Sequence, residues 1–477
     1  MKNNKTTTRA HARSRLATII GAAVMATTLA GCSTGQNYAR PKISLPSSWT
    51  FAGKKDAPKP PELAGWWKSF NDPTLDTLVD KAVSGNLDVA TARSRVEEAR
   101  ASLRQAGGDL YPSSSGSSSA RRAKSQAGTA SNFQAGLDAS WEIDLFGANQ
   151  HTVEAARFGL NAAEEELRAT TLTLVGDIAS NYVSARGYQA RQALAAKNAS
   201  LQRETLELTR EKQNLGAGTG LDVANAEGQT FNTEANIPQL AASYSETVNR
   251  LSVLTGEAPG ALNRIMEKGR GKVPTARASV KAGVPADLLN DRPDVRVAEY
   301  KLSQSKARTG VADANRYPSV TLTGNISTSA ADFGDLAKGS SIGWGFGPAI
   351  NIPVFNAGKL KAAAEVAKAQ EDQAFIAYRA AVLGALEDVE NAAVSLTQQR
   401  RSNAKLASSV GSYSQAAELS RTLYREGATA FIDVLSAERS LYSAQDNLIQ
   451  SRVALANDFI ALNKALGGGW NGQSSAK

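Results

Sequence analysis

Two similar stretches far apart in the chain decide the fold. The first reads LDVATARSRVEEARASLRQAGGDLYPS from Leu87 to Ser113, and the second reads PDVRVAEYKLSQSKARTGVADANRYPS from Pro293 to Ser319. Both end in Tyr-Pro-Ser, and Pro112 and Pro318, which we expect at the entry to strands, are 206 residues apart. A repeat of this length is far too long for a solenoid unit, so it indicates that a whole structural half is duplicated.

The correspondence between the halves continues beyond these stretches. Two further matches have offsets of 209 and 211 residues: Leu145-Phe146-Gly147 with Val354-Phe355-Asn356, and Leu221-Asp222-Val223 plus Glu227 with Ile432-Asp433-Val434 plus Glu438. The small drift in offset is what loop insertions between matched elements produce. Each half therefore has the same predicted order: a helix, Tyr-Pro, two strands, a very long helix, a break that contains glycine, and another helix.

An alternation of apolar and polar residues predicts the strands. It runs from Phe133 to Leu145 in the first half, and from Val320 to Ile326 and Ile342 to Ile352 in the second. The partner strand expected from Pro112 to Lys124 is rich in serine and shows the pattern weakly. Segments of about ten residues with one apolar and one polar face are typical of membrane-spanning barrel strands. A half-exposed soluble sheet shows the same alternation, so this signal alone leaves both open.

Two regions predict unusually long helices. Thr152 to Leu215 and Lys359 to Glu426 contain no proline, and at 1.5 Å per residue such segments reach on the order of 100 Å. Apolar residues near them follow heptad spacings: Val382, Leu386, Val389, Ala393 and Leu396; Leu441, Leu448, Leu455 and Leu462; and, more weakly, Ile237, Tyr244 and Leu251. Heptad seams of this kind predict helices that are wound around each other.

The residue types argue against an enzyme, a metal site or a cofactor. The only histidines are His11 and His151, and Cys32 is the only cysteine. Catalytic triads, Cys/His pairs and zinc sites need residues that are nearly absent here. The net charge is +9, and leaving out the five basic residues of the leader lowers it to +4. Such a small excess of positive charge does not indicate a nucleic-acid partner.

The first 31 residues are expected to be a lipoprotein signal peptide. A basic start is followed by the apolar run from Leu16 to Ala30, which is too short to span a bilayer permanently. The leader ends in Leu29-Ala30-Gly31-Cys32, which resembles the bacterial lipobox. Cys32 is therefore the candidate anchor for a covalent diacylglycerol and fatty acyl lipid. Ser33 after it favours sorting to the outer membrane.

Membrane crossing beyond the leader is expected through strands, because no later stretch approaches 18 consecutive apolar residues. Four strands per chain cannot close a barrel, since the smallest filled barrels need about eight, and an open edge is not tolerated in lipid. Several chains are therefore expected to pool their strands. The alternative from another class is a surface coiled-coil lipoprotein scaffold, which needs neither the strands nor the duplicated Tyr-Pro.

The chain resembles the TolC-type outer membrane factors, in the efflux lipoprotein branch typified by OprM and NodT. The resemblance rests on five motifs in order: Trp66-Trp67 with Asp72-Pro73, WEIDLFG from Trp141, LNDRPDVRVAE from Leu289, GPAINIPVFNAGK from Gly347 and YREGATAFIDVLSAER from Tyr424. It implies a mostly α-helical homotrimer whose 12-stranded outer membrane β-barrel, with four strands per chain, continues into a long α-helical periplasmic barrel.

The resemblance also implies a function and partners. Members serve as the passive exit duct of a tripartite efflux system, together with a periplasmic adaptor and an inner membrane pump of the resistance-nodulation-division class. Use as the exit duct of a type I protein secretion system remains an alternative. We therefore expect an outer membrane location, with lipid contacts and an extension into the periplasm.

Gate residues are carried over by position. Reversals at Gly216 and Gly427 join the helix pairs, and the residues that match the family's periplasmic constriction are Asp222, Tyr424, Ile432, Asp433 and Arg439. Asp222 and Tyr424 match residues that pair with each other, and Asp433 matches an aspartate that forms a ring at the pore. Thr429 and Ser436 stand where relatives carry an arginine and an aspartate, so Arg439 is expected to use Asp433 as its partner or to form a looser lock.

These signals divide the chain into five segments. Residues 1–31 are the signal peptide, 32–73 an extended lipid-anchored segment, 74–285 and 286–467 the two structural repeats, and 468–477 a flexible tail.

Overall fold

The computed structural model describes residues 45, 46, 48–50, 65–126, 128–276, 285 and 292–468. The predicted signal peptide and Cys32 lie outside these residues. The main helices and strands of these residues are α2 (Pro73–Gly85), α3 (Leu87–Gly108), β1 (Ser113–Ser125), β2 (Gly128–Ile143), α4 (Ala148–Asn214), α5 (Gly220–Leu254), α6 (Asn263–Met266), α8 (Pro293–Ala314), β3 (Ser319–Ala330), β4 (Ile342–Asn351), α9 (Lys359–Arg425) and α10 (Phe431–Ala465). The predicted order of elements is confirmed in both halves.

The chain folds into two compact units, and each takes parts of both repeats. The described residues of the first unit fall in Glu97–Ala162 and Ala298–Tyr378, which hold the four strands and the helix ends next to them. Those of the second unit fall in Lys42–Val96, Ala163–Val297 and Arg379–Lys477, which hold most of the helical residues. The division by compactness therefore differs from the division into repeats.

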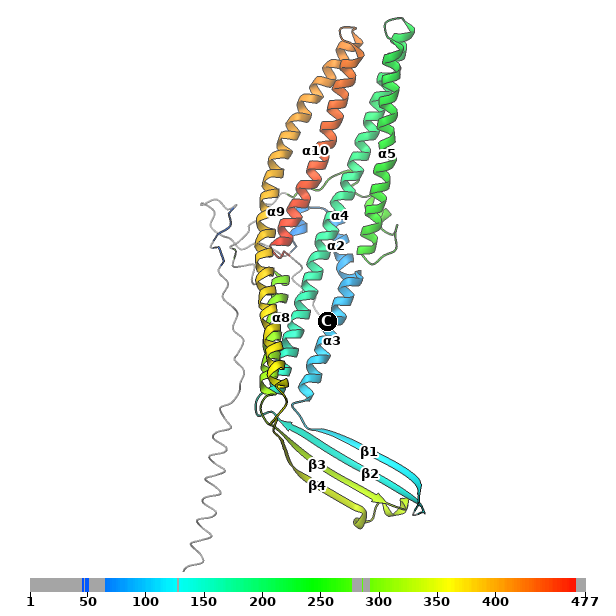
Figure 1. The fold of residues 1–477 in the computed structure, drawn as a ribbon. Helices are drawn as coiled ribbons and strands as arrows, with labels where there is room; N and C mark the ends of the chain where they lie inside the picture. Colours follow the sequence, from blue (N-terminus) through cyan, green and yellow to red (C-terminus); the bar gives the residue numbers. More distant parts are fainter. Residues whose placement is uncertain are drawn as a thin grey trace, which may run out of the picture. The chain divides into compact units, whose positions relative to one another are not determined.

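The strands form one antiparallel sheet in the order β1-β2-β3-β4 (Figure 1). The serine-rich segment is a full strand, whose pairing with β2 runs without a bulge from Ser113↔Ser140 to Ser125↔Gly128. β2 then pairs with β3, and β3 with β4, so the two halves meet between β2 and β3. Within the described sheet, β1 and β4 are the edges, and each has one side without a neighbouring strand.

The register gives the sheet one apolar and one polar face. Residues directly opposite each other point to the same face, and that face alternates along each strand. The large apolar side chains therefore gather on one face: Phe133, Leu137, Trp141, Ile143, Val320, Leu322, Ile326, Ile342, Trp344, Phe346 and Ile350. Most of them are strongly exposed, with Trp344 at 80% and Phe346 at 73%. Such a face needs an apolar environment outside the single chain.

Two glycines in the sheet make room for large neighbours on this apolar face. A Cβ at Gly324 would lie 3.3 Å from the Phe346 ring, and one at Gly116 would lie 3.3 Å from a methyl group of Leu137. The two side chains therefore lie over bare backbone on the adjacent strand, an arrangement that compensates for glycine in a strand.

The helices of the second unit are long and run in pairs. α4 and α9 each have 67 residues, and α5 and α10 each have 35. Figure 1 shows α4 beside α5 and α9 beside α10. The heptad seams are largely buried, with Val389 and Leu251 at 0% exposure. Among the helices of the described residues, none has both the length and the apolar character needed to cross a bilayer.

Arg186 of α4 is a buried hub that ties neighbouring segments to this helix. Its side chain is 0% exposed and donates to Gln189 Oε1 and to the carbonyl oxygen of Met266, both at 2.8 Å, and to the carbonyl oxygen of Lys268. It also donates to the Tyr182 hydroxyl, which in turn donates to Asp72 at 2.5 Å. Burial and the hydrogen bond to Asp72 raise the pKa of Tyr182. The arginine therefore satisfies the carbonyl groups of Met266 and Lys268 from inside the fold, where its own side chain does not reach water.

The DRPD part of the repeated motif has a structural role. Arg292 is 8% exposed and forms ion pairs with Asp294 at 2.6 Å and with Asp388 of α9 at 3.0 Å. It also donates to the carbonyl oxygen of Ala465, at the end of α10. Burial opposes ionisation of Asp294, but the bonds from Arg292 outweigh it and lower the pKa of this carboxyl group. The motif therefore joins the start of α8 to two other helices.

Arg186→Met is expected to loosen the segment from Asn263 to Lys268. It removes the donor of the part-buried Lys268 carbonyl group and leaves the buried Met266 carbonyl group with only the 3.3 Å bond from Gln189, at a cost of about 1 to 3 kcal/mol. The measurement is amide hydrogen exchange, where protection around Met266 should fall. Arg203→Met is the matched control, because Arg203 is 59% exposed in its pair with Glu234 and contributes less than about 1 kcal/mol. Equal loss of protection in both variants would contradict the role of the hub.

Candidate functional site

Both helix pairs turn over at a glycine. Gly216 has a φ of 74° and Gly427 a φ of 77°, a region that favours glycine. The amide after each glycine reaches back to close the helix: Ala217 donates to the carbonyl of Lys212 and Ala428 to that of Leu423, both at 2.8 Å. These are Schellman motifs, and they explain the two glycines at matched positions.

The two predicted gate aspartates lie in the first turns of the returning helices. Asp222 forms a capping box with Thr219, whose hydroxyl donates to Asp222 Oδ2 at 2.7 Å. Asp433 accepts a hydrogen bond from the Thr429 hydroxyl. Each aspartate thus has a threonine hydroxyl as a local partner within its own turn. The positive N-terminal end of the helix stabilises both carboxylates further.

Tyr424, the predicted partner of Asp222, is instead held between helices of the same chain. It is 6% exposed, and its hydroxyl donates to Thr209 Oγ1 of α4 at 3.3 Å. Its ring meets the Phe431 ring edge-on at 5.8 Å. Tyr424 therefore joins α9 to α4, and within one chain the structure does not bring it together with Asp222.

Lys212 of α4 contributes a second link to Tyr424 that the sequence reading missed. Its ammonium group lies 4.4 Å from the centre of the Tyr424 ring and donates to the Tyr424 carbonyl oxygen at 2.5 Å. A cation over an aromatic face is attracted by the ring. The carbonyl also accepts from the Gly427 N–H at 3.1 Å, so the ammonium group binds directly at the reversal. We call Lys212, Thr209 and Tyr424 the latch, because together they join α4 of the first helix pair to α9 of the second.

Arg439 has a different partner from the one expected. Its Nε donates to the side-chain oxygen of Gln229 in α5 at 2.6 Å, so it joins α10 to α5. Neither Asp433 nor the position of Ser436 provides its partner within the chain. Of the two alternatives expected for Arg439, a lock through Asp433 is absent within the described chain; the neutral amide binds a cation less strongly than a carboxylate does, as in a looser lock. Ile432, the predicted apolar residue of the gate, has a side chain that is 57% exposed in the single chain.

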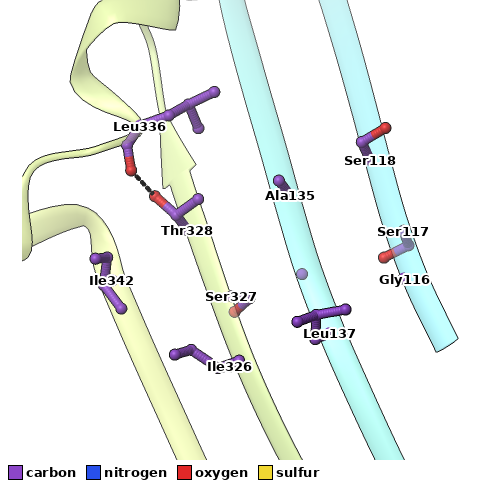
Figure 2. A pocket seen from close by; sticks show the side chains of 11 residues that line it. Gly116, Ser117, Ser118, Ala135, Leu137, Ile326, Ser327, Thr328, Leu336 and Ile342 are labelled. Carbon is purple, nitrogen blue, oxygen red and sulfur yellow. Dashed lines mark hydrogen bonds between the residues drawn. The ribbon is translucent and has the colours of Figure 1, made fainter. Parts of the chain in front are cut away.

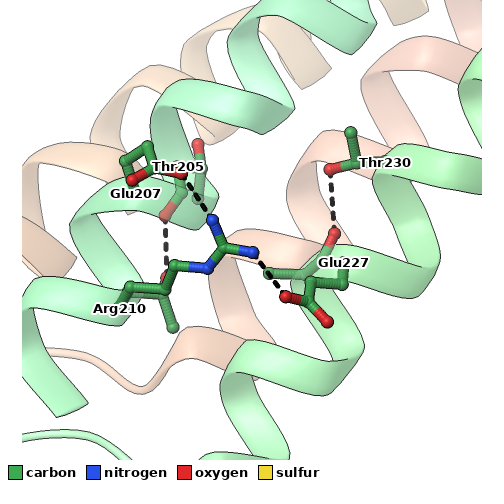
Figure 3. Close-up of polar contacts among 7 residues, drawn as sticks. Thr205, Glu207, Arg210, Glu227 and Thr230 are labelled. Carbon is green, nitrogen blue, oxygen red and sulfur yellow. Dashed lines mark hydrogen bonds and ion pairs between the residues drawn. The ribbon is translucent and has the colours of Figure 1, made fainter.

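Each helix pair also carries an internal arginine–glutamate clamp at the same place. Arg210 contacts Glu227 at 2.5 Å, and Arg421 contacts Glu438 at 2.6 Å. Figure 3 shows Arg210 between Glu207 of its own helix and Glu227 of α5. The hydrogen bond that Arg210 donates to Glu227 raises the pKa of Arg210. Both clamps span 17 residues and are 211 residues apart, so the repeat offset that matched the glutamates also identifies the arginines.

A small apolar cluster lies between these polar links. Its buried members come from all four long helices: Leu206, Ala226, Tyr424, Phe431, Val434 and Leu435. Glu438 is also buried at 5% exposure and is satisfied by Arg421 and by the hydroxyl of Thr205.

Near the reversals each helix pair is held internally by an arginine–glutamate ion pair, whereas the pairs are joined by the latch, by Arg439 and by the Thr205–Glu438 hydrogen bond. Farther along the helices, Arg191 of α4 and Asp446 of α10 form an ion pair at 2.6 Å. The pairs can therefore part at the reversals without breaking either clamp, while this ion pair keeps them joined farther along.

The described residues contain no group of His, Cys, Asp and Glu side chains that is suited to a metal ion. The contacts near the reversals hold helices together, and none of them presents a nucleophile next to a base. The side chains at the reversals therefore have a mechanical role, which is to hold helices together.

Comparison with known proteins identifies the family. Residues 78–257 and 284–468 match the model of the family described as outer membrane efflux protein. The chain is 36% identical over 449 residues to nodulation protein T of Rhizobium leguminosarum bv. trifolii, which covers 93% of this chain and 96% of the relative. The outer-membrane channel OprN has a TM-score of 0.84 at 31% identity, covering 92% of this chain and all of its own.

A third relative has been described in an open state. The MtrE outer membrane channel of Neisseria gonorrhoeae has a TM-score of 0.80 at 28% identity and covers 92% of this chain and 98% of its own. These matches extend over both units of the chain, and they decide against a coiled-coil scaffold and against an enzyme. The chain belongs to the outer membrane efflux protein family, whose members form channels in the outer membrane that extend into the periplasm and let efflux substrates out.

Proposed function

We propose that three copies of the chain pool their strands into one 12-stranded outer membrane barrel. The observation that carries this proposal is the four-stranded sheet, with one apolar face, one polar face and two unpaired edges. In lipid every backbone polar group needs a partner, so β1 of one copy pairs with β4 of the next. The apolar face then meets lipid, and the polar face lines the passage.

The long helices continue the same passage into the periplasm. Three copies of the two helix pairs form a tube, and its partners are a periplasmic adaptor and an inner membrane pump of the resistance-nodulation-division class. The substrates move passively through the duct, as in the other channels of the family. We also propose the five segments drawn from the sequence as the domain organisation of the chain.

The gate lies at the helix reversals in this proposal. Asp222, Tyr424, Ile432, Asp433 and Arg439 surround it, and the latch holds the two helix pairs of each copy together. Opening separates the pairs at the reversals by breaking the contacts of Lys212 and Arg439 and the Thr205–Glu438 hydrogen bond, while the two arginine–glutamate clamps and the Arg191–Asp446 ion pair remain closed. The open state described for a related channel supports a gate of this kind.

Asp433→Asn is expected to reduce the preference of the channel for cations. Three copies of Asp433 around one axis place three carboxylates at the throat, and a ring of carboxylates attracts cations. Wild-type protein in planar bilayers should show a small, cation-preferring conductance. In the variant the cation-to-anion permeability ratio, measured from reversal potentials under a salt gradient, should fall about twofold or more.

Glu426→Gln is the matched control, since Glu426 is an exposed carboxylate at the other side of the same reversal. An unchanged permeability ratio in Asp433→Asn would place the constriction elsewhere. Well-folded trimer that forms no pore at all would refute the channel itself.

Lys212→Met is expected to favour the open state. It removes the charged hydrogen bond and the cation–ring contact to Tyr424, which together contribute about 1 to 3 kcal/mol in each copy. The open probability in planar bilayers should therefore rise about tenfold or more. Lys197→Met on the same helix is the control, because Lys197 is exposed and forms no ion pair among the described residues. Open probability equal to wild type in Lys212→Met would show that the latch does not hold the gate.

Cys32→Ala is expected to abolish the lipid anchor. The thiol of Cys32 is the acceptor in the lipobox reading, so the variant should lack diacylglycerol and fatty acyl groups and the cleavage before residue 32. Intact-mass spectrometry of the mature N-terminus measures both, with Ser33→Ala as the control that keeps the lipid. A wild-type N-terminus without lipid would contradict the anchor, whereas the channel proposal would stand.

A further inference from the structure

Two basic side chains lie on the apolar face of the sheet. Ala120 of β1 is opposite Phe133, so Arg122 and Lys124 point to the same face as that ring. Both are exposed, and no carboxylate of the described residues pairs with either. A charge on a face that meets lipid is costly near the middle of the bilayer and is tolerated near the headgroups.

The carboxylates of the strands do not balance these charges. Asp138 is opposite Ser115 and Asn325, and Glu142 is opposite Thr321, so both acids lie on the polar face. Arg121, which directly precedes Arg122 in the chain, is on that polar face too. Arg122 and Lys124 therefore present an unneutralised positive patch on the apolar face.

The patch lies at the end of the sheet that faces away from the connections to the helices. β1 follows α3 and β2 leads into α4, so the turn between Ser125 and Gly128 is the opposite end. Two aromatic rings lie near it: those of Phe133 and Phe333 meet edge-on at 5.8 Å. Aromatic side chains gather at the depth of the lipid headgroups in membrane barrels. With the helices in the periplasm, this end lies at the outer leaflet.

An open cavity lies on the same face next to the patch. It has a volume of 470 Å³, and its apolar lining includes Leu137, Ile326, Leu336 and Ile342. Figure 2 shows that the Thr328 hydroxyl donates to the Leu336 carbonyl oxygen, which fixes the loop beside the cavity. Ser118 at its rim is four residues from Arg122, or about 13 Å along the strand. One lipid molecule spans that distance from its phosphate to its acyl chain.

We propose that this surface binds a phosphorylated glycolipid of the outer leaflet. Arg122 and Lys124 hold its phosphate groups, the Phe133–Phe333 pair lies at the boundary between headgroup and acyl region, and the cavity receives an acyl chain. The site rests on the proposed function, because it needs the sheet in the membrane with its apolar face outward. It is independent of the gate, which uses none of these residues.

The test is native mass spectrometry of delipidated full-length trimer titrated with bis-phosphorylated lipid A. The Arg122→Gln and Lys124→Gln double variant should bind the lipid about tenfold more weakly, because it lacks both cations that attract the phosphate groups. Arg121→Gln is the matched control, since it removes a charge from the same strand on the other face. The control should keep wild-type lipid affinity, and dephosphorylated lipid A should bind wild type as weakly as it binds the double variant.

Three results would overturn the proposal. One is equal affinity of wild type for phosphorylated and dephosphorylated lipid. Another is the same loss in Arg121→Gln as in the double variant. The last is displacement of the lipid by millimolar inorganic phosphate, which would indicate a site for the free anion. Conductance in planar bilayers is recorded for every variant: a missing pore refutes the channel, whereas a normal pore without phosphate-dependent lipid binding refutes only the lipid site.

Discussion

The unpaired edges of β1 and β4 are the constraint on which the rest of this structure depends. Each edge has a row of backbone N–H and C=O groups without a neighbouring strand in the described sheet, and each such group costs several kcal/mol in lipid. A second copy of the chain satisfies them by continuing the ladder, and a closed ring leaves none unsatisfied. Because the helices follow the strands directly in the chain, the same rotational symmetry applies to them. A helical tube and a shared gate follow from that symmetry.

The architecture was readable from the sequence because its signals are local. Alternation in β2, β3 and β4, and heptad spacing in the long helices, are properties of neighbouring residues. β1 gave a weak signal for a physical reason: the positions on its apolar face are Ser114, Gly116, Ser118 and Ala120, and Leu137 lies over the glycine. Only its place after the repeated Tyr-Pro identified it. Sequence reasoning also found the reversal glycines, since a positive φ leaves few alternatives.

The contacts at the gate could not be read in the same way, and the duplication explains why. The clamps use arginine and glutamate in both repeats, so a matched offset reveals them. The links between the helix pairs use positions at which the repeats differ: Lys212 matches Leu423, and Arg439 matches Gly228. No periodicity marks such residues, and their partners depend on how helices from different halves pack. The duplicated parts hold each pair together, and the diverged parts join one pair to the other.

The serine-rich strand also bears on the route that the chain takes before it reaches its membrane. A strand whose every residue tolerates water does not drive aggregation, whereas a fully apolar segment exposed in transit invites pairing with other chains. β1 is a strand of the first, water-tolerant kind, and it lies at an edge of the sheet, where unwanted pairing begins. β4, at the other edge, carries the strongly exposed Trp344 and Phe346. In an unassembled chain, the β4 edge is therefore prone to association and the β1 edge is not. This difference favours pairing of β4 with β1 of another copy and disfavours pairing of two like edges during biogenesis.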